Sequence, residues 1–338
     1  MTNALNIIAD SDIPYLKGVL EPYANITYKK GKDITNLDLR ETEVIIIRTR
    51  TVCNEALLKN TKVKLILTAT IGFEHIDLNY CEKSKICVKT AAGCNARGVL
   101  QWVAATLVND SKEQGWSAEQ KTLGVIGVGN VGSLIASYGG SWGFKVLCCD
   151  PYKDNKNYVS AEEIYSKADI ITFHVPCTKT GKWPTYRMFS SKACEMIKPG
   201  ALILNASRGE VLHTASIKEY LDKFRFAIDT WEGEPELDQD LLLSSCISTP
   251  HIAGYSVQGK ANGTSMVVNS LAEIYDLPLK NWYPDNVKKT EIKTISWQDL
   301  CREIPKYYDI IKESEQLKSS PSDFETMRNN YTFREEFF

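Results

Sequence analysis

The chain has 338 residues, of which 43% are hydrophobic and 24% are charged, and its formal net charge is −2. This length is enough for two domains and a small third one. The near-neutral charge gives no reason to expect a nucleic acid as a partner, and no run approaches the roughly 18 apolar residues of a membrane span. The N-terminus resembles no secretory signal, so we expect a cytoplasmic protein without membrane contact.

The ten cysteines are spread along the chain, and no two of them form a C-x-x-C pair. In a long chain without a secretory signal this pattern indicates reduced thiols, and it predicts no metal site. Cys94 lies where the chain is expected to pass between domains. A buried thiol is the favoured interpretation there, and a reactive thiol is the alternative.

The first part of the chain alternates short apolar runs with helical or polar stretches, which predicts a parallel α/β domain. The predicted strands are residues 6–10, 43–48, 63–70 and 86–91, and the predicted short helices are residues 54–59 and 77–85. Ligands of open α/β sheets gather at the carboxyl ends of strands, so Arg48, Thr49 and Thr70 are candidates for substrate contacts. For the two threonines, ordinary turn chemistry is the alternative.

Residues 99–108 are apolar at helical spacing, and we expect this helix to lead the chain into a second domain. Asn95 lies just before it. Its side chain either caps the helix or faces the substrate, and capping is the commoner role.

The strongest motif follows in residues 121–150, where a strand, a glycine-rich turn, a helix and a second strand end in an acid. Gly127 permits the tight turn, Gly129 lets a phosphate approach the backbone, and Gly132 lets the helix pack closely on the strand. The helix N-terminus then attracts a pyrophosphate. Asp150 can accept hydrogen bonds from a ribose diol and would repel a 2′-phosphate, which predicts NAD rather than NADP. An ordinary strand–helix turn is the alternative.

The alternation continues beyond Asp150. Strands are predicted at residues 169–175, 201–206, 225–231 and 246–251, with helices at 161–168, 191–197, 214–224 and 258–275. The last helix would carry the chain back to the first domain. We therefore predict two doubly wound parallel-sheet (Rossmann-like) domains with a cleft between them. Residues 1–95 and 252–280 would bind substrate, and residues 96–251 would bind NAD.

Residues 281–338 are polar and charge-mixed but contain many aromatic side chains. Such a segment is too aromatic to stay disordered and too short for a large core of its own. It predicts a small C-terminal dimerisation domain, and hence a homodimer.

Three ionisable residues follow predicted strands of the second domain: Arg208, Glu234 and His251. Removing a hydride from a secondary alcohol requires a base for the hydroxyl proton, and an imidazole has an ordinary pKa near 6.5 that suits this task. A carboxylate on its other nitrogen favours the imidazolium, and an arginine can hold a substrate carboxylate bidentately. Packing for the histidine and solvation for the other two are the alternatives.

Several of these stretches together resemble the D-2-hydroxyacid dehydrogenases. The resemblance runs from Asp10 to about Phe333. It rests on GVGNVG with CDP, NASRG, DTWEGEPE and TPHIAGYSVQGKANGT, and also on TATIGFEHID, AAGCNA and the tail FETMRNNYTFREEF. It implies NAD-dependent oxidation of a small 2-hydroxy acid, here a phosphorylated one, and a C-terminal dimerisation domain. Longer relatives continue past the position of Phe338, so we expect that domain to be abbreviated.

The resemblance also implies roles for single residues. Arg208, Glu234 and His251 would form the catalytic set, while Thr49, Thr70 and Tyr255 would touch substrate. The residues implied at the NAD site are Gly127, Gly129, Asn130, Val131, Gly132, Asp150, Val175, Ala206, Ser207, Arg208, Asp229 and Gly254. Ser207 and Val175 depart from the cysteine and threonine frequent in relatives, which affects only side-chain hydrogen bonds.

Two other functions stay open at this point. Another D-2-hydroxyacid dehydrogenase, such as one acting on 3-phosphoglycerate, would share every catalytic residue. A non-catalytic NAD-sensing protein could also use this fold. For the substrate's phosphate, Arg48 and Arg50 are the nearest basic candidates in the sequence.

Overall fold

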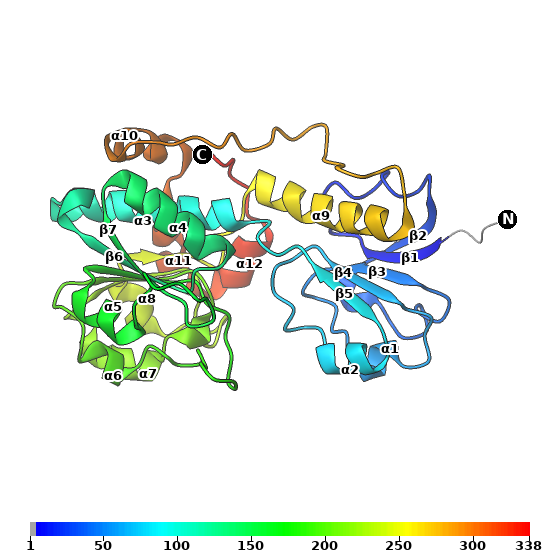
Figure 1. The fold of residues 1–338 in the computed structure, drawn as a ribbon, viewed down its shortest axis with the longest axis horizontal. Helices are drawn as coiled ribbons and strands as arrows, with labels where there is room; N and C mark the ends of the chain where they lie inside the picture. The colour runs from blue at the N-terminus through cyan, green and yellow to red at the C-terminus, as the bar shows by residue number, and fades with distance from the viewer. Residues whose placement is uncertain (1–4) are drawn as a thin grey trace. The chain divides into compact units, whose positions relative to one another are not determined.

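The computed structural model describes residues 5–338, and the chain divides into two compact units (Figure 1). Unit 1 contains the described residues up to Asn95 together with Val257–Lys289, and unit 2 contains Ala96–Ser256 together with Thr290–Phe338. Each unit has its own parallel sheet with helices on both faces. The predicted class of two doubly wound α/β domains is therefore confirmed.

Unit 1 has a five-stranded sheet in the order β2-β1-β3-β4-β5. Its strands are β1 (Leu5–Asp10), β2 (Ala24–Lys29), β3 (Val44–Ile47), β4 (Leu65–Thr68) and β5 (Cys87–Thr90), and its helices are α1 (Glu55–Leu58), α2 (Leu78–Lys83) and α9 (Val257–Tyr275). Every residue of β3 and β4 is buried, as expected for parallel strands covered on both faces. Ile46 packs in the same cluster as Val268 of α9, and Ile45 packs in the cluster of Leu58 and Cys81 from α1 and α2.

Unit 2 has a six-stranded sheet in the order β11-β10-β9-β8-β6-β7. Its strands are β6 (Thr122–Ile126), β7 (Lys145–Cys149), β8 (Ile170–Phe173), β9 (Leu202–Asn205), β10 (Arg225–Ile228) and β11 (Ile247–Ser248). Its helices are α3 (Ala96–Gln114), α4 (Asn130–Trp142), α5 (Ala161–Lys167), α6 (Ser191–Cys194), α7 (Thr214–Ile217), α8 (Gln239–Ser244), α10 (Trp297–Tyr307), α11 (Ile310–Ser319) and α12 (Phe324–Asn329). Ser160 caps α5 by accepting from Glu163 N, as the sequence pattern predicts.

Several predicted elements differ in extent or were missed. The edge strand β2 was not predicted, because its residues are only half-buried and carry a weak apolar pattern. The crossing helix α3 is longer than residues 99–108, and the region 214–224 forms only the short α7 followed by a 3-10 turn at Lys218–Tyr220. Strand β11 ends early because Pro250 has no N–H and His251 adopts a left-handed φ of 56°.

The largest departure concerns the C-terminal segment, residues 290–338, drawn in orange and red in Figure 1. Leu300 and Phe338 belong to one core cluster of unit 2, and Leu317 and Phe324 belong to the other. These residues therefore complete the core of unit 2 and do not build a third core. The predicted boundaries also move, since residues 252–256 fall in unit 2 and residues 281–289 in unit 1.

None of the ten cysteines, all of which lie within residues 5–338, forms a disulfide bond, and Cys94 is buried. Within residues 5–338, no helix combines the length and the apolar character required to cross a membrane.

We expect Leu300→Ala to destabilise unit 2 by roughly 3 kcal/mol, because it empties a fully buried position. Thermal or urea unfolding of the full chain measures the change. The matched control is Ile292→Ala, since the Ile292 side chain is 77% exposed and its truncation should leave unfolding unchanged. Equal effects of the two changes would contradict the placement of this segment in the core.

Candidate active site

The predicted site residues of unit 2 follow the carboxyl ends of its parallel strands. His251 follows β11, Glu234 follows β10 and Arg208 follows β9. These three strands are adjacent in the sheet, whereas the glycine turn follows β6 and Asp150 follows β7 at the opposite edge. Because β7 and β8 flank β6, the turn lies where the strand order reverses, which is the usual ligand site of such sheets.

The glycine turn has the geometry that a dinucleotide requires. Gly127 has a φ of 85°, and a Cβ there would lie 2.5 Å from His174 O. A Cβ on Gly132 would lie 1.9 Å from Gly127 O, so α4 can approach β6 only with glycine at this position. Apart from the two chain neighbours of Gly129, no atom of residues 5–338 lies within 4 Å of a Cβ placed on this glycine, and no side chain in that range caps α4. Asn130 and Val131 form the first residues of that helix, where N–H groups face an anion.

Asp150 is tied to the same turn. Its Oδ2 accepts from Val128 N at 3.1 Å, and its Oδ1 accepts from Tyr152 N at 3.2 Å. A carboxylate has about four lone-pair positions, so two single bonds leave capacity for a ribose diol. The lysine next in the loop, Lys153, donates to Val128 O. The residues present therefore fit NAD.

The loops after β8 and β9 contain further residues that were predicted to line the NAD site. Val175 lies beside Gly127, with its Cγ1 only 2.6 Å from the Cβ position of that glycine. Ser207, which follows Ala206, donates from both N and Oγ to the buried Asn205 Oδ1, at 3.1 and 2.8 Å. Arg208 Nη1 donates to Ser207 O at 2.8 Å. The Ser207 hydroxyl thus fixes its own loop rather than replacing a cofactor contact of cysteine.

The loop after β9, which carries Arg208, contacts the loop after β10, which carries Glu234. Asn205 Nδ2 donates to Arg208 O at 2.9 Å and to Thr230 O at 3.3 Å. A Cβ on Gly209 would lie 2.0 Å from Trp231 O, so the two loops touch backbone to backbone. The position of Arg208 relative to the loop of Glu234 is therefore set by buried contacts.

Glu234 and His251 are hydrogen-bonded, with 2.5 Å between Glu234 Oε1 and His251 Nδ1. The other carboxylate oxygen accepts from Trp231 N at 3.2 Å. Burial raises the pKa of Glu234, but the hydrogen bond and charge of His251 and the bond from Trp231 outweigh it, and the net shift is downward. The Glu234 carboxylate therefore stays ionised at neutral pH.

Asp229 lies at the end of β10 and is fully buried. Its Oδ1 accepts from Thr249 Oγ1, Ile252 N and Ala253 N, at 2.7, 2.8 and 3.0 Å. Burial raises the pKa of Asp229, against the charge of His251 and these bonds. Through these hydrogen bonds Asp229 holds the loop that carries His251. Gly254 of the same loop lies against Gly98 of α3.

Tyr255 is surrounded by the C-terminal segment, a feature that the sequence reasoning missed. Its ring centroid lies 6.0 Å from those of Tyr331 and Phe333. Arg328 of α12 forms a hydrogen bond with Tyr255. Burial lowers the pKa of Arg328, but its interactions with Tyr255 and Glu234 outweigh burial, so the net shift of this pKa is upward. The only signal in the sequence was the tail motif itself, which does not reveal which surface it covers.

The candidates in unit 1 follow the adjacent strands β3 and β4. Thr49 is exposed, and Thr70 Oγ1 lies 2.6 Å from Thr68 Oγ1, so Thr70 also takes part in turn chemistry. Arg48 donates to Asp10 at 3.0 Å and to Asp12 at 2.9 Å. Its charge is balanced by two carboxylates, which argues against a phosphate there.

Asn95 does not act as the predicted helix cap. Its buried Oδ1 has no hydrogen-bond partner among the described residues. The capping prediction is therefore wrong, and the contact with substrate stays a prediction.

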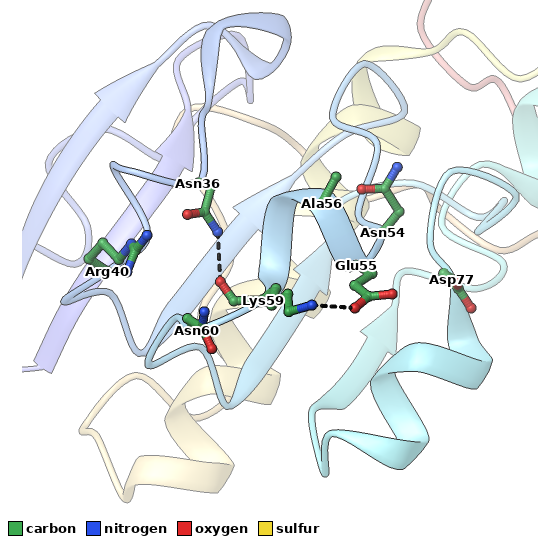
Figure 2. Close-up of a pocket in the computed structure, with 8 residues that line it drawn as sticks. All are labelled: Asn36, Arg40, Asn54, Glu55, Ala56, Lys59, Asn60 and Asp77. Atoms are coloured by element: carbon green, nitrogen blue, oxygen red, sulfur yellow. Dashed lines mark hydrogen bonds and ion pairs between the residues drawn. The ribbon is translucent and has the colours of Figure 1, made fainter.

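A pocket of unit 1 lies apart from every predicted site residue (Figure 2). The polar groups on its wall are partly paired with one another, since Asn36 Nδ2 donates to Lys59 O at 2.8 Å and Lys59 Nζ donates to Glu55 Oε1 at 3.1 Å. We assign it no role. Among the described residues no group of three or more His, Cys, Asp or Glu side chains could hold a metal ion.

Comparison with known proteins agrees with this geometry. The family described as "D-isomer specific 2-hydroxyacid dehydrogenase, NAD binding domain" matches residues 92–253. An erythronate-4-phosphate dehydrogenase of Bacteroides fragilis is 39% identical over 98% of this chain and 97% of its own. The chain belongs to the erythronate-4-phosphate dehydrogenase family. The matched NAD-binding domain, residues 92–253, includes the glycine turn and the loops of Arg208, Glu234 and His251. The cofactor of this chain is therefore NAD.

Solved structures show the same fold. The D-lactate dehydrogenase of Aquifex aeolicus, in complex with NAD and lactic acid, has a TM-score of 0.64 and 25% identity over 80% of this chain and 96% of its own. The NAD-bound 3-phosphoglycerate dehydrogenase of Entamoeba histolytica has a TM-score of 0.68 and 20% identity over 85% of this chain and 100% of its own. This erythronate-4-phosphate dehydrogenase family member is thus an NAD-dependent D-2-hydroxyacid dehydrogenase by sequence and by fold.

We expect Gly129→Ala to weaken NAD binding about tenfold or more without lowering the unfolding temperature, because the added methyl group meets no protein atom but stands where the pyrophosphate approaches. NADH fluorescence titration and thermal unfolding measure the two quantities. Gly140→Ala, also in open space on α4, is the control; it should keep its NAD affinity, and its unfolding temperature should stay the same or rise because alanine favours a helix. Normal NAD affinity in Gly129→Ala would remove the turn from the cofactor site.

Proposed function

We propose that the chain oxidises the 2-hydroxyl group of 4-phospho-D-erythronate to (R)-3-hydroxy-2-oxo-4-phosphooxybutanoate with NAD as the acceptor, a cytoplasmic step of pyridoxal 5′-phosphate biosynthesis. The observation that carries this proposal is the 2.5 Å hydrogen bond between Glu234 and His251. These two residues and the dinucleotide turn all follow the carboxyl ends of strands of the same parallel sheet. Three relatives that are 38% or 39% identical over 98% of this chain bear the name erythronate-4-phosphate dehydrogenase, which supports the choice of substrate.

His251 would act as the base. Its Nδ1 is held by Glu234, which orients the ring and leaves Nε2 as the atom that takes the proton of the substrate hydroxyl. The ionised Glu234 stabilises the resulting imidazolium. NAD, when bound, accepts the hydride from C2, so the products are the 2-oxo acid, NADH and one proton.

Arg208 would bind the substrate's C1 carboxylate. A guanidinium forms two parallel hydrogen bonds with a carboxylate and also polarises the carbonyl that develops at the neighbouring C2. The contacts of its loop through Asn205 and Gly209 hold the backbone of Arg208 next to the loop that carries Glu234. We further propose that Thr49, Thr70 and Tyr255 touch the substrate.

The deciding experiment measures NADH absorbance with 4-phosphoerythronate, 3-phosphoglycerate and glycerate in parallel. We expect 4-phosphoerythronate to have the highest kcat/KM. His251→Ala is the matched variant; it should lose roughly 10²–10⁴-fold in kcat while keeping its NAD affinity, since a positioned base contributes about that much. A preference for 3-phosphoglycerate would select another dehydrogenase of the family, and NAD binding without turnover on any acid would select the sensing protein.

We also propose that two chains assemble into a homodimer through surfaces that include the C-terminal segment. The expected molar mass by gel filtration with light scattering is about twice the 38.0 kDa of one chain. A mass equal to one chain at micromolar concentration would contradict this proposal.

A further inference from the structure

The loop that carries His251, residues 249–256, has an unfavourable backbone. His251 has a φ of 56°, a left-handed conformation that a side chain with a Cβ rarely adopts. Such conformations persist only where surrounding contacts hold them, and they concentrate at functional sites. The contacts that hold this loop are therefore part of what places the imidazole.

One face of the loop is held by β10. Asp229 O accepts from His251 N at 2.8 Å, and Asp229 Oδ1 accepts from the N–H groups of Ile252 and Ala253. These bonds satisfy the N–H groups of His251, Ile252 and Ala253. Ile252 O accepts from Tyr255 N at 2.8 Å, and the carbonyl groups of both Ile252 and Ala253 also accept from a partner outside the loop.

That partner is Arg334 of the C-terminal segment, which is only 8% exposed. Its Nη1 donates to Ile252 O at 3.1 Å, and its Nη2 donates to Ala253 O and, at 3.0 Å, to Gly98 O at the start of α3. The peptide groups directly after His251 are thus bound through their N–H groups by a buried carboxylate and through their carbonyls by a buried guanidinium.

Arg334 is itself fixed by its neighbours. Its Nη1 also donates to Tyr331 OH at 3.0 Å, and its guanidinium lies 4.2 Å from the ring centre of Tyr308. The hydroxyl groups of Tyr331 and Tyr308 each donate to Glu313 at 2.6 Å. Arg334 Nε has no hydrogen-bond partner among the described residues, so the guanidinium is held through its two Nη groups and the ring of Tyr308. These contacts orient the planar fork of donors that faces the loop carbonyls.

The chain on either side of Arg334 follows the loop as well. The backbones of Ser256 and Arg334 form an isolated parallel bridge, and Ser256 Oγ donates to Glu336 Oε1 at 2.7 Å. Together with the rings of Tyr331 and Phe333 on Tyr255, these contacts line the whole loop.

We propose that Arg334 is a positioning residue, which acts through the carbonyls of Ile252 and Ala253 to hold the His251 loop in the conformation that presents the imidazole to Glu234 and to substrate. This inference rests on the proposed function. It assigns the C-terminal segment a part in catalysis by its own subunit, separate from any part in dimerisation. The glycine turn follows β6, which is separated from β10 and β11 by β8 and β9, so we expect NAD binding at that turn not to depend on Arg334.

The test uses Arg334→Lys in the full-length protein, because an ammonium keeps the charge but cannot bind the carbonyls as a planar fork. We expect kcat to fall about tenfold or more, since small misplacements of a catalytic group have effects of that order, with NAD affinity retained. With substrate deuterated at C2, the isotope effect on kcat should rise, because hydride transfer becomes slower relative to product release. Loss of folded protein alone would lower kcat without raising the isotope effect.

A second measurement requires no substrate. Hydrogen exchange followed by mass spectrometry should show faster exchange in residues 249–256 of Arg334→Lys and unchanged exchange in residues 122–132. Tyr331→Phe, which keeps the ring but removes one contact of Arg334, is the milder variant if the lysine variant folds poorly, and should shift both readouts in the same direction. Arg302→Lys, on the exposed face of α10 in the same segment, is the control and should shift neither.

Wild-type kcat and isotope effect in both Arg334→Lys and Tyr331→Phe would overturn the proposal, as would unchanged exchange of the loop. If the unaltered protein oxidised none of the acids, the proposed function would fail. The exchange measurement would still decide whether Arg334 holds the loop.

Discussion

The site of unit 2 depends on one constraint, the parallel direction of its six strands. In a parallel sheet all strands end at the same end of the sheet. Residues far apart in the chain, such as Gly129, Arg208 and His251, therefore lie beyond the carboxyl ends of the same set of strands. The strand order then separates the two chemical tasks. The cofactor turn follows β6, while the group proposed to bind the substrate carboxylate follows β9 and the pair proposed for proton transfer follows β10 and β11.

The proton-transfer end of that edge is held by buried polar groups rather than by apolar packing. Asn205 joins two of the loops, and Asp229 and Arg334 bind the loop of His251 from opposite sides. Each of these groups would be costly to bury alone, and each forms hydrogen bonds with backbone groups of the loops. Networks of this kind specify one loop conformation, which a catalytic imidazole requires.

The C-terminal segment shows how a short addition can gain a role inside a larger fold. Its aromatic residues were expected to mark a separate domain, yet they complete the core of unit 2, and Trp297 stacks on Trp116 at 5.7 Å. A segment of this size buries too little surface to fold by itself. Once it packs on unit 2, Arg328 and Arg334 reach the loop that carries His251 and Tyr255.

The sequence alone predicted the alternation of strands and helices and the dinucleotide turn with Asp150, because these signals lie in local spacing and in residue chemistry. It also made Arg208, Glu234 and His251 candidates, and their catalytic roles are a proposal. It did not predict the edge strand β2, the absence of a cap at Asn95, the pairing of Arg48 with two aspartates, or the partner of the His251 loop. Those features arise from contacts between residues distant in the chain. Only the tertiary structure could decide them, because which buried charge meets which carbonyl depends on packing that no local pattern records.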